Sequence, residues 1–274
     1  MQVEQLEVEC DGALLYVESR GQGTPVLLIQ GGIGEAGATE QLATALAGRF
    51  CVISYDRRGL SRSTSSSETG PITMDRHAAD AGAVLAASTS EPAHVVGASI
   101  GALIGLHLVA LEPDRVATLV AHEPPMSAVV FDPAREAALD QVAATAQEDV
   151  RSAIRQMGSL TGARESMEDG ARPAPPTGDL TANLQHFFEH DFPAVRSSSL
   201  IADDLVDSAK STNIVLTGGD LSRGQWEYRC AEQLASDLGV PFAELPGGHN
   251  GLVSHPKATA AALTRILDRV ALTS

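Results

Sequence analysis

The chain has 274 residues, enough for one large α/β domain with an inserted lid but too few for three independent domains. Hydrophobic residues make up 43% and charged residues 20%, so a packed core is expected and global disorder is not. There are 19 Lys and Arg against 35 Asp and Glu, a net charge of −16. A surface this acidic repels phosphate backbones and anionic lipids, so we expect no nucleic-acid and no membrane partner.

The cysteines and the first segment of the chain bear on its cellular compartment. Cys10, Cys51 and Cys230 are far apart and form no Cys-x-x-Cys pair, which argues against a disulfide framework and a zinc site. Residues 1–10 contain neither a basic region nor an apolar stretch, as a signal peptide would require. The longest apolar run, residues 100–111, is too short to span a bilayer. We therefore expect a cytoplasmic protein.

Strand and helix patterns alternate along most of the chain. Residues 2–10 and 13–20 predict a hairpin around Asp11-Gly12. Strands are also predicted at 25–30, 50–55, 94–98, 116–121, 213–217 and 241–245, and helices at 38–47, 73–89, 100–111, 226–238 and 256–271. Repeated β-α-β units predict an α/β fold with a mostly parallel sheet of about eight strands and helices on both faces.

The alternation stops between residues 127 and 206, where no strand pattern occurs. The segment has mostly helical patterns, interrupted at 161–179 by a stretch rich in Gly, Pro and charge that predicts a loop. Because it lies between two strands of one sheet, we interpret 127–206 as a helical cap. Residues 1–126 and 207–274 would then form the core domain.

The motif Gly97-Ala98-Ser99-Ile100-Gly101 follows a predicted strand and opens a predicted helix. This context is typical of a nucleophile elbow, a sharp strand-to-helix turn that presents a serine hydroxyl. Small residues on both sides of Ser99 let the backbone turn without a clash. The alternative is an ordinary Gly-rich turn whose serine caps the helix.

A serine nucleophile needs a base, and the base needs an acid to orient it. His249 lies in the Gly-rich segment 246–251, after the last predicted strand, and so at the same edge of the sheet as Ser99. Two carboxylates compete for the role of the acid: Asp220, after the strand at 213–217, and Glu123, after the strand at 116–121. For His77, His94, His186 and His190 the sequence identifies no partner.

Together these motifs resemble the α/β-hydrolase superfamily over essentially the whole chain. The resemblance rests on Gly97–Gly101, the Gly-rich loop 30–34, the run 55–63 and the segment 246–250. Members of the superfamily usually carry His-Gly where this chain has Gln30-Gly31. They also commonly carry an acid three residues past the glycine that ends the penultimate strand, whereas Asp220 directly follows that glycine here.

Within the superfamily the chain most resembles the serine-hydrolase group that includes zearalenone lactonases. The shared features are Gly32-Ile33-Gly34-Glu35, His122-Glu123-Pro124-Pro125 and Ser254-His255-Pro256. In that group the acid follows the sixth strand, so the resemblance implies Glu123 as the acid and Asp220 as the alternative.

The remaining expectations concern the oxyanion hole and the basic loop. We expect the backbone N–H groups of Gly32 and Ile100 to stabilise the oxyanion. Arg57, Arg58 and Arg62 follow a predicted strand, and we interpret them as residues that brace the loop, with a substrate contact as the alternative.

Apolar side chains cluster in and beside the predicted cap: Met126, Phe131, Leu184, Phe187, Phe188 and Phe192. They predict an apolar ceiling over Ser99, although packing among the cap helices explains the same pattern. We expect Met126, Phe187 and Phe188 to contact the substrate, together with Ile33.

The sequence therefore predicts a serine hydrolase, free of cofactor and metal, that cleaves a carboxylic ester or lactone through an acyl-enzyme. Two alternatives stay open. One is carbon–carbon bond hydrolysis or a biosynthetic tailoring reaction on the same triad. The other is a receptor-like protein that binds a ligand on a hydrolase scaffold. The expected partner is a small-molecule substrate; a homodimer is compatible with the sequence, which does not decide the oligomeric state.

Overall fold

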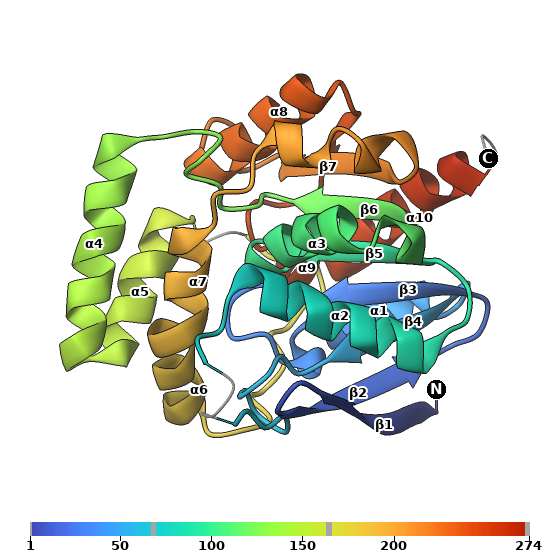
Figure 1. Ribbon diagram of the computed structural model, residues 1–274, viewed down its shortest axis with the longest axis horizontal. Helices are drawn as coiled ribbons and strands as arrows, with labels where there is room; N and C mark the ends of the chain where they lie inside the picture. The colour runs from blue at the N-terminus through green and yellow to red at the C-terminus, as the bar shows by residue number, and fades with distance from the viewer. Residues whose placement is uncertain (1, 67–69, 163–165, 272–274) are drawn as a thin grey trace.

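A computed structural model describes residues 2–66, 70–162 and 166–271. Eight strands form one sheet in the order β1-β2-β4-β3-β5-β6-β7-β8 (Figure 1). The strands are β1 (Val3–Cys10), β2 (Ala13–Arg20), β3 (Thr24–Ile29), β4 (Phe50–Tyr55), β5 (Ala93–Ala98), β6 (Val116–His122), β7 (Asn213–Gly219) and β8 (Phe242–Leu245). β1 and β2 pair antiparallel with each other and β2 with β4, and the pairs from β4 to β8 are parallel. The predicted fold class is confirmed.

Helices cover both faces of the sheet. They are α1 (Glu40–Leu46), α2 (Met74–Ser88), α3 (Ile100–Leu111), α8 (Trp226–Leu238), α9 (Gly251–Ser254) and α10 (Pro256–Ala271). Side chains of α2, α3 and α8 pack into one apolar core, and those of α1, α9 and α10 pack into a second. Every residue of β5 is buried, as expected for a central strand covered on both faces. The sheet thus holds the carboxyl ends of β3, β5, β6, β7 and β8 at one edge.

The segment between β6 and β7 supplies a further group of helices, which we call the cap. They are α4 (Pro133–Glu148), α5 (Val150–Leu160), α6 (Leu180–His186), the π-helical turn η4 (Phe187–Asp191) and α7 (Phe192–Ser197). Figure 1 shows α4 to α7 grouped together at one side of the sheet. Aspartates cap three of these helices, because the side chains of Asp132, Asp149 and Asp179 accept hydrogen bonds from first-turn N–H groups.

Short 3-10 turns lie before α1, after α3 and before β7: η1 (Ala36–Thr39), η3 (Pro113–Arg115), η5 (Ala202–Leu205) and η6 (Ser208–Lys210). Over the described ranges, no helix is long and apolar enough to cross a membrane.

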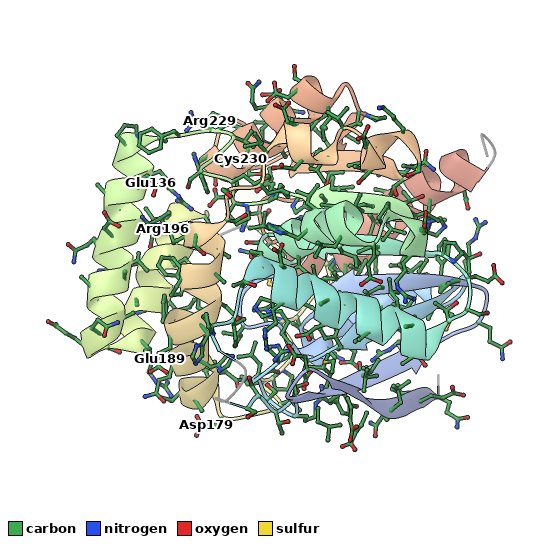
Figure 2. The ribbon with its side chains drawn as sticks, viewed as in Figure 1. Glu136, Asp179, Glu189, Arg196, Arg229 and Cys230 are labelled. Atoms are coloured by element: carbon green, nitrogen blue, oxygen red, sulfur yellow. The ribbon has the colours of Figure 1, made fainter. Side chains whose placement is uncertain are left out.

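An apolar cluster holds the cap helices together. It consists of Leu139, Val142, Ala153, Phe187, Phe188 and Phe192. Charged contacts add to it: Arg196 of α7 donates to Glu136 and Asp140 of α4 at 2.9 Å each, and Figure 2 shows Arg196 and Glu136 facing each other. The expectation that Phe131 belongs to the apolar ceiling is wrong. Phe131 is 71% exposed, lies just before the N-cap of α4 and is not part of the apolar cluster.

Candidate active site

Ser99 lies at the sharp turn between β5 and α3. Its backbone has φ 54° and ψ −123°, a conformation that is strained for a residue other than glycine. The turn needs small neighbours. A Cβ on Gly97 would lie 2.2 Å from the carbonyl oxygen of Gly101, and a Cβ on Gly101 would lie 2.0 Å from that of Ile29. The sequence thus folds locally into the elbow that the motif predicts, with Ser99 at its tip.

A buried carboxylate holds the imidazole of His249. The Nδ1 atom of His249 lies 2.8 Å from Oε2 of Glu123, and the side chains are 6% and 0% exposed. The other carboxylate oxygen, Oε1, accepts a hydrogen bond from the backbone N–H of Gly219 at 2.8 Å and one from the Ser222 hydroxyl. These three contacts together fix the orientation of the Glu123 carboxylate toward His249.

The electrostatics of this pair favour its charged form. Burial alone raises the pKa of Glu123, but the hydrogen bond from His249, the nearby His122 and the hydrogen bond from Ser222 lower it to about 2. Burial alone lowers the pKa of His249, but the hydrogen bond to Glu123 and the charge of Glu227 raise it above its ordinary value. Glu123 is therefore ionised at neutral pH, and a proton on the imidazole is stabilised.

Asp220, the alternative acid, makes a different contact. Its Oδ1 accepts a hydrogen bond from the backbone N–H of Gly247 at 3.0 Å, and so it braces the loop that carries His249. Members of the superfamily commonly carry the acid where this chain has Ser222, and here the Ser222 hydroxyl donates to Glu123 instead. Ser222 thus helps to fix the carboxylate of Glu123, the residue that follows β6.

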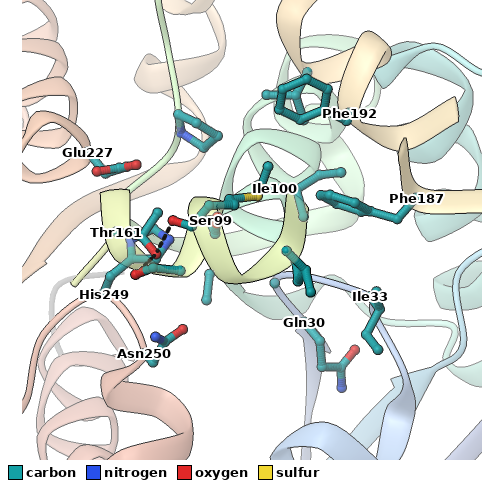
Figure 3. Close-up of a pocket in the computed structure, with 18 of the residues that line it drawn as sticks. Gln30, Ile33, Ser99, Ile100, Thr161, Phe187, Phe192, Glu227, His249 and Asn250 are labelled. Atoms are coloured by element: carbon teal, nitrogen blue, oxygen red, sulfur yellow. Dashed lines mark hydrogen bonds between the residues drawn. The ribbon is translucent and has the colours of Figure 1, made fainter. Parts of the chain in front are cut away.

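A cavity of about 420 Å³ lies over Ser99, between the core and the cap. Six residues predicted for the site line it: Gly32, Ile33, Ser99, Ile100, Phe187 and His249. Figure 3 shows His249 and Glu227 on one side of Ser99, with Phe187, Ile33 and Gln30 on the other. Two residues predicted to contact the substrate do not line this cavity. Met126 is buried in the core of the sheet, and Phe188 packs inside the apolar cluster of the cap.

The Gly-rich loop after β3 approaches Ser99 closely. A Cβ on Gly31 would lie 3.2 Å from the Cβ of Ser99. Gly32 has φ 52°, a left-handed conformation that glycine adopts without strain. Gly32 and Ile100 both line the cavity beside Ser99, and their N–H groups stay the predicted oxyanion hole.

Arg57 fixes the position of the Gly-rich loop after β3. Its guanidinium donates to the carbonyl oxygen of Gln30 at 3.0 Å and to that of Gly32. It also donates to the carboxylate of Asp191, in the cap, at 2.8 Å. His77 on α2 binds the same carboxylate through Nε2 at 2.9 Å. The sequence identified Arg57 as a bracing residue but gave no sign of Asp191 or His77 as its partners, which lie far away along the chain.

Three charged side chains besides His249 line the cavity: Arg135, Arg196 and Glu227. Arg196 binds carboxylates of α4, as described above, whereas Arg135 forms a buried ion pair with Glu227. The sequence did not single out this pair, because a Glu in the first turn of a helix is usually a surface residue that complements the helix dipole. Within the described ranges, no group of three or more His, Cys, Asp or Glu side chains could hold a metal ion.

Comparison with known proteins identifies the family of this chain. A model of the alpha/beta hydrolase fold matches residues 24–261. The chain belongs to the α/β-hydrolase superfamily. A hydrolase of Bacillus subtilis (strain 168), YraK, whose function is uncharacterised, is 30% identical over 98% of both chains.

Two further relatives carry more specific names. A pimeloyl-[acyl-carrier protein] methyl ester esterase of Chromobacterium violaceum is 40% identical over 38% of this chain and 39% of its own. The solved structure of Est816, described as an N-acyl homoserine lactone degrading enzyme, has a TM-score of 0.71 and 23% identity over 94% of this chain and 99% of its own. The protein is thus a hydrolase of the α/β-hydrolase fold, and the structural likeness to Est816 concerns the fold alone.

Proposed function

We propose that the protein is a serine hydrolase that cleaves a carboxylic ester or lactone, with Ser99, His249 and Glu123 as its triad. The observation that carries the proposal is the 2.8 Å contact between Glu123 and Nδ1 of His249, at a cavity whose floor is the strained Ser99. The arrangement has the three roles that acyl transfer needs: a presented hydroxyl, a base and a group that orients the base.

In the first half of the proposed reaction, Ser99 attacks the substrate carbonyl. Because Nδ1 of His249 donates to Glu123, Nε2 is the nitrogen that accepts the serine proton. A bond forms between Oγ and the carbonyl carbon, and the carbonyl oxygen becomes an oxyanion that accepts hydrogen bonds from the N–H groups of Gly32 and Ile100. Collapse of this intermediate breaks the ester bond, and His249 returns the proton to the leaving alkoxide.

In the second half, water attacks the acyl-enzyme with His249 again as the base. Ionised Glu123 stabilises the imidazolium that forms in each half. For a lactone the leaving alkoxide stays tethered to the acyl group, so the product is one hydroxy acid. The esterase activity named for the relative from Chromobacterium violaceum supports this class of substrate.

The cavity lining supports a mainly apolar substrate. Aliphatic and aromatic side chains of the core and the cap make up much of it: Ile33, Leu139, Ile154, Met157, Phe187, Phe192, Val195, Trp226, Leu252 and Val253. Such a surface favours esters with extended apolar groups over short polar ones, because burial of each methylene contributes about 0.8 kcal/mol.

A fluorophosphonate probe followed by peptide mass spectrometry tests the nucleophile directly. We expect phosphonylation of Ser99 alone, loss of labelling in His249→Ala, and hydrolysis of nitrophenyl esters that disappears in Ser99→Ala. Carbon–carbon bond hydrolysis would appear as turnover of β-diketones instead of esters. Ligand binding that survives Ser99→Ala, with no labelling and no turnover in the wild type, would overturn the proposal in favour of a binding protein.

A further inference from the structure

Arg135 and Glu227 place an ion pair in the wall of the cavity. Arg135 lies in the first turn of α4 and Glu227 in the first turn of α8, so the pair joins the cap to the core. The guanidinium binds Oε1 of Glu227 and donates to the carbonyl oxygen of Leu160 at 3.1 Å. It also lies over the ring of Trp226, 5.0 Å from its centroid. These contacts engage both terminal nitrogens of Arg135, whereas its Nε has no hydrogen-bond partner among the described residues.

Glu227 uses only half of its hydrogen-bonding capacity. Its side chain is 2% exposed, and Oε2 has no hydrogen-bond partner among the residues that the structure describes. A buried carboxylate oxygen without a partner is unfavourable, because it has lost its hydration and gained no hydrogen bond in exchange. Glu227 lines the cavity, and Figure 3 shows its carboxylate on the same side of Ser99 as His249. A buried, charged acceptor without a partner, on a residue that lines the cavity, is suited to bind a donor on the substrate.

Gln30 on the opposite side of Ser99 is a weaker candidate for the same role. Its Oε1 also lacks a partner among the described residues, while its Nε2 bonds to Thr39 at 3.1 Å. Half a turn of the amide exchanges its oxygen and nitrogen, so Gln30 can offer the cavity either a donor or an acceptor. A carboxylate offers acceptors only, so a substrate group that binds Glu227 must be a hydrogen-bond donor.

The charge balance indicates which kind of donor fits. Arg135 neutralises Glu227, and an ammonium group added to this apolar cavity would bring an uncompensated charge. A hydroxyl group brings a donor without a charge. It also forms a stronger hydrogen bond with a carboxylate than with a neutral acceptor.

We propose that Glu227, positioned by Arg135, is a specificity residue that accepts a hydrogen bond from a hydroxyl group of the substrate. The preferred substrate is then an apolar ester or lactone that carries a hydroxyl on the Glu227 side of the scissile carbonyl. This inference rests on the proposed function, because it takes the cavity over Ser99 to be the substrate site.

The test compares hydroxyl substrates with their methyl ethers, which keep the oxygen but lack the donor. Nitrophenyl esters of ω-hydroxyalkanoic acids of increasing chain length are paired with their ω-methoxy counterparts, and the same pairs are made with the hydroxyl in the alcohol part of alkyl esters. We expect the wild type to prefer the hydroxyl ester of at least one pair by about tenfold in kcat/KM. A tenfold ratio corresponds to about 1.4 kcal/mol, which one charge-assisted hydrogen bond can supply. The same pairs are titrated into Ser99→Ala by calorimetry, which reads the preference without turnover.

Two variants and a control identify the acceptor. Glu227→Gln keeps a neutral oxygen and should reduce the preference. The double variant Arg135→Met, Glu227→Leu replaces the whole pair with apolar side chains of similar size, which proteins often tolerate, and should abolish it. Glu232→Gln makes the same chemical change at an exposed position of α8 and should leave the preference and the activity as they are. Fluorophosphonate labelling of Ser99 in each variant checks that the site is folded.

The outcomes separate this inference from the proposed function. Ester hydrolysis without a hydroxyl preference in any pair, or a preference that persists in the double variant, overturns the role of Glu227 and leaves the proposed function intact. A binding preference in Ser99→Ala that depends on Glu227, without hydrolysis by the wild type, supports the subsite and overturns the proposed function. Equal losses on both members of each pair would assign Glu227 a purely structural role and also overturn the inference.

Discussion

Arg57 of the core and Asp191 of the cap form an ion pair that is closed off from solvent. Their nitrogen and oxygen atoms are 2.8 Å apart, and the side chains are 1% and 0% exposed. The same guanidinium binds the carbonyl oxygens of Gln30 and Gly32 in the loop beside Ser99. One side chain therefore links the position of the cap to the shape of the proposed oxyanion hole.

Asp191→Asn should destabilise the protein by about 3–5 kcal/mol, because it leaves the buried Arg57 charge without a counterion. Urea unfolding measures the change. Asp268→Asn is the matched control. Its partner Arg49 is 61% exposed, and a surface pair of this kind contributes about 0–1 kcal/mol. A loss for Asp191→Asn no larger than for the control would contradict the role of the buried pair.

Arg57→Lys should lower kcat more than it raises KM. A lysine keeps the charge but cannot bind two carbonyl oxygens and a carboxylate with one planar group. The Gly32 amide would then lose its fixed position at the oxyanion, and loss of one such donor costs about a hundredfold in kcat. Steady-state kinetics on a nitrophenyl ester measure both constants. A change confined to KM would mean that Arg57 does not position the loop for the transition state.

Glu123→Gln should lower kcat by about 10³- to 10⁴-fold, because the amide cannot stabilise the imidazolium. Asp220→Asn should change it by about twofold or less, since Asp220 is exposed and an amide oxygen still accepts from Gly247. The two variants are compared at equal concentrations of folded protein, with folding checked by circular dichroism. The reverse ranking would make Asp220 the acid.

The acid limb of the kcat/KM profile should lie above pH 6.5, the ordinary value for histidine. His249 acts as a base only when it is unprotonated, and its raised pKa means that activity falls, as pH decreases, through a midpoint higher than 6.5. In Glu123→Gln the lost hydrogen bond and charge should move that midpoint downward. A midpoint that stays in place in the variant would show that Glu123 does not control the ionisation of His249.

Phe187→Ala should raise KM for long-chain apolar esters by about tenfold, the effect of losing about 1.4 kcal/mol of apolar contact with the substrate. Phe188→Ala is the matched control. It removes the same side chain from the same apolar cluster, but Phe188 does not line the cavity over Ser99. Both variants should lose stability, and only the first should lose affinity. Equal effects on KM would mean that the contribution of Phe187 comes from packing of the cap.

The elbow and the position of His249 could be predicted because local chemistry dictates them. Ser99 needs small residues on either side of its turn, and the close contacts of Gly97 and Gly101 give the physical reason. The apolar runs of the central strands predict burial on both faces, which the fully buried β5 confirms. Once the strands are parallel, their carboxyl ends lie at one edge, and the loops that carry Ser99 and His249 must meet there.

The side-chain partners could not be predicted in the same way. Glu123 and His249 are 126 residues apart, Arg57 and Asp191 are 134 apart, and Arg135 and Glu227 are 92 apart. The sequence alone left Glu123 and Asp220 as competing acids, and it gave no pairing for Arg135. Nor did it separate Phe187 from Phe188, which are neighbours in the chain but face different surroundings.

The amino-acid sequence by itself determined the α/β fold, the turn that presents Ser99 and the edge of the sheet where the site forms. These follow from hydrophobic period, from glycine at tight turns and from the geometry of parallel strands, all of which act over short stretches of chain. Only the tertiary structure decided which carboxylate meets His249, what neutralises Arg57 and which ion pair lines the cavity. The contacts of Arg57 and Arg135 depend on how the cap packs against the core, and that of His249 on how the ends of β6 and β8 are placed in the sheet. An ion pair or a hydrogen bond forms only when packing brings distant residues to within a few ångströms of each other.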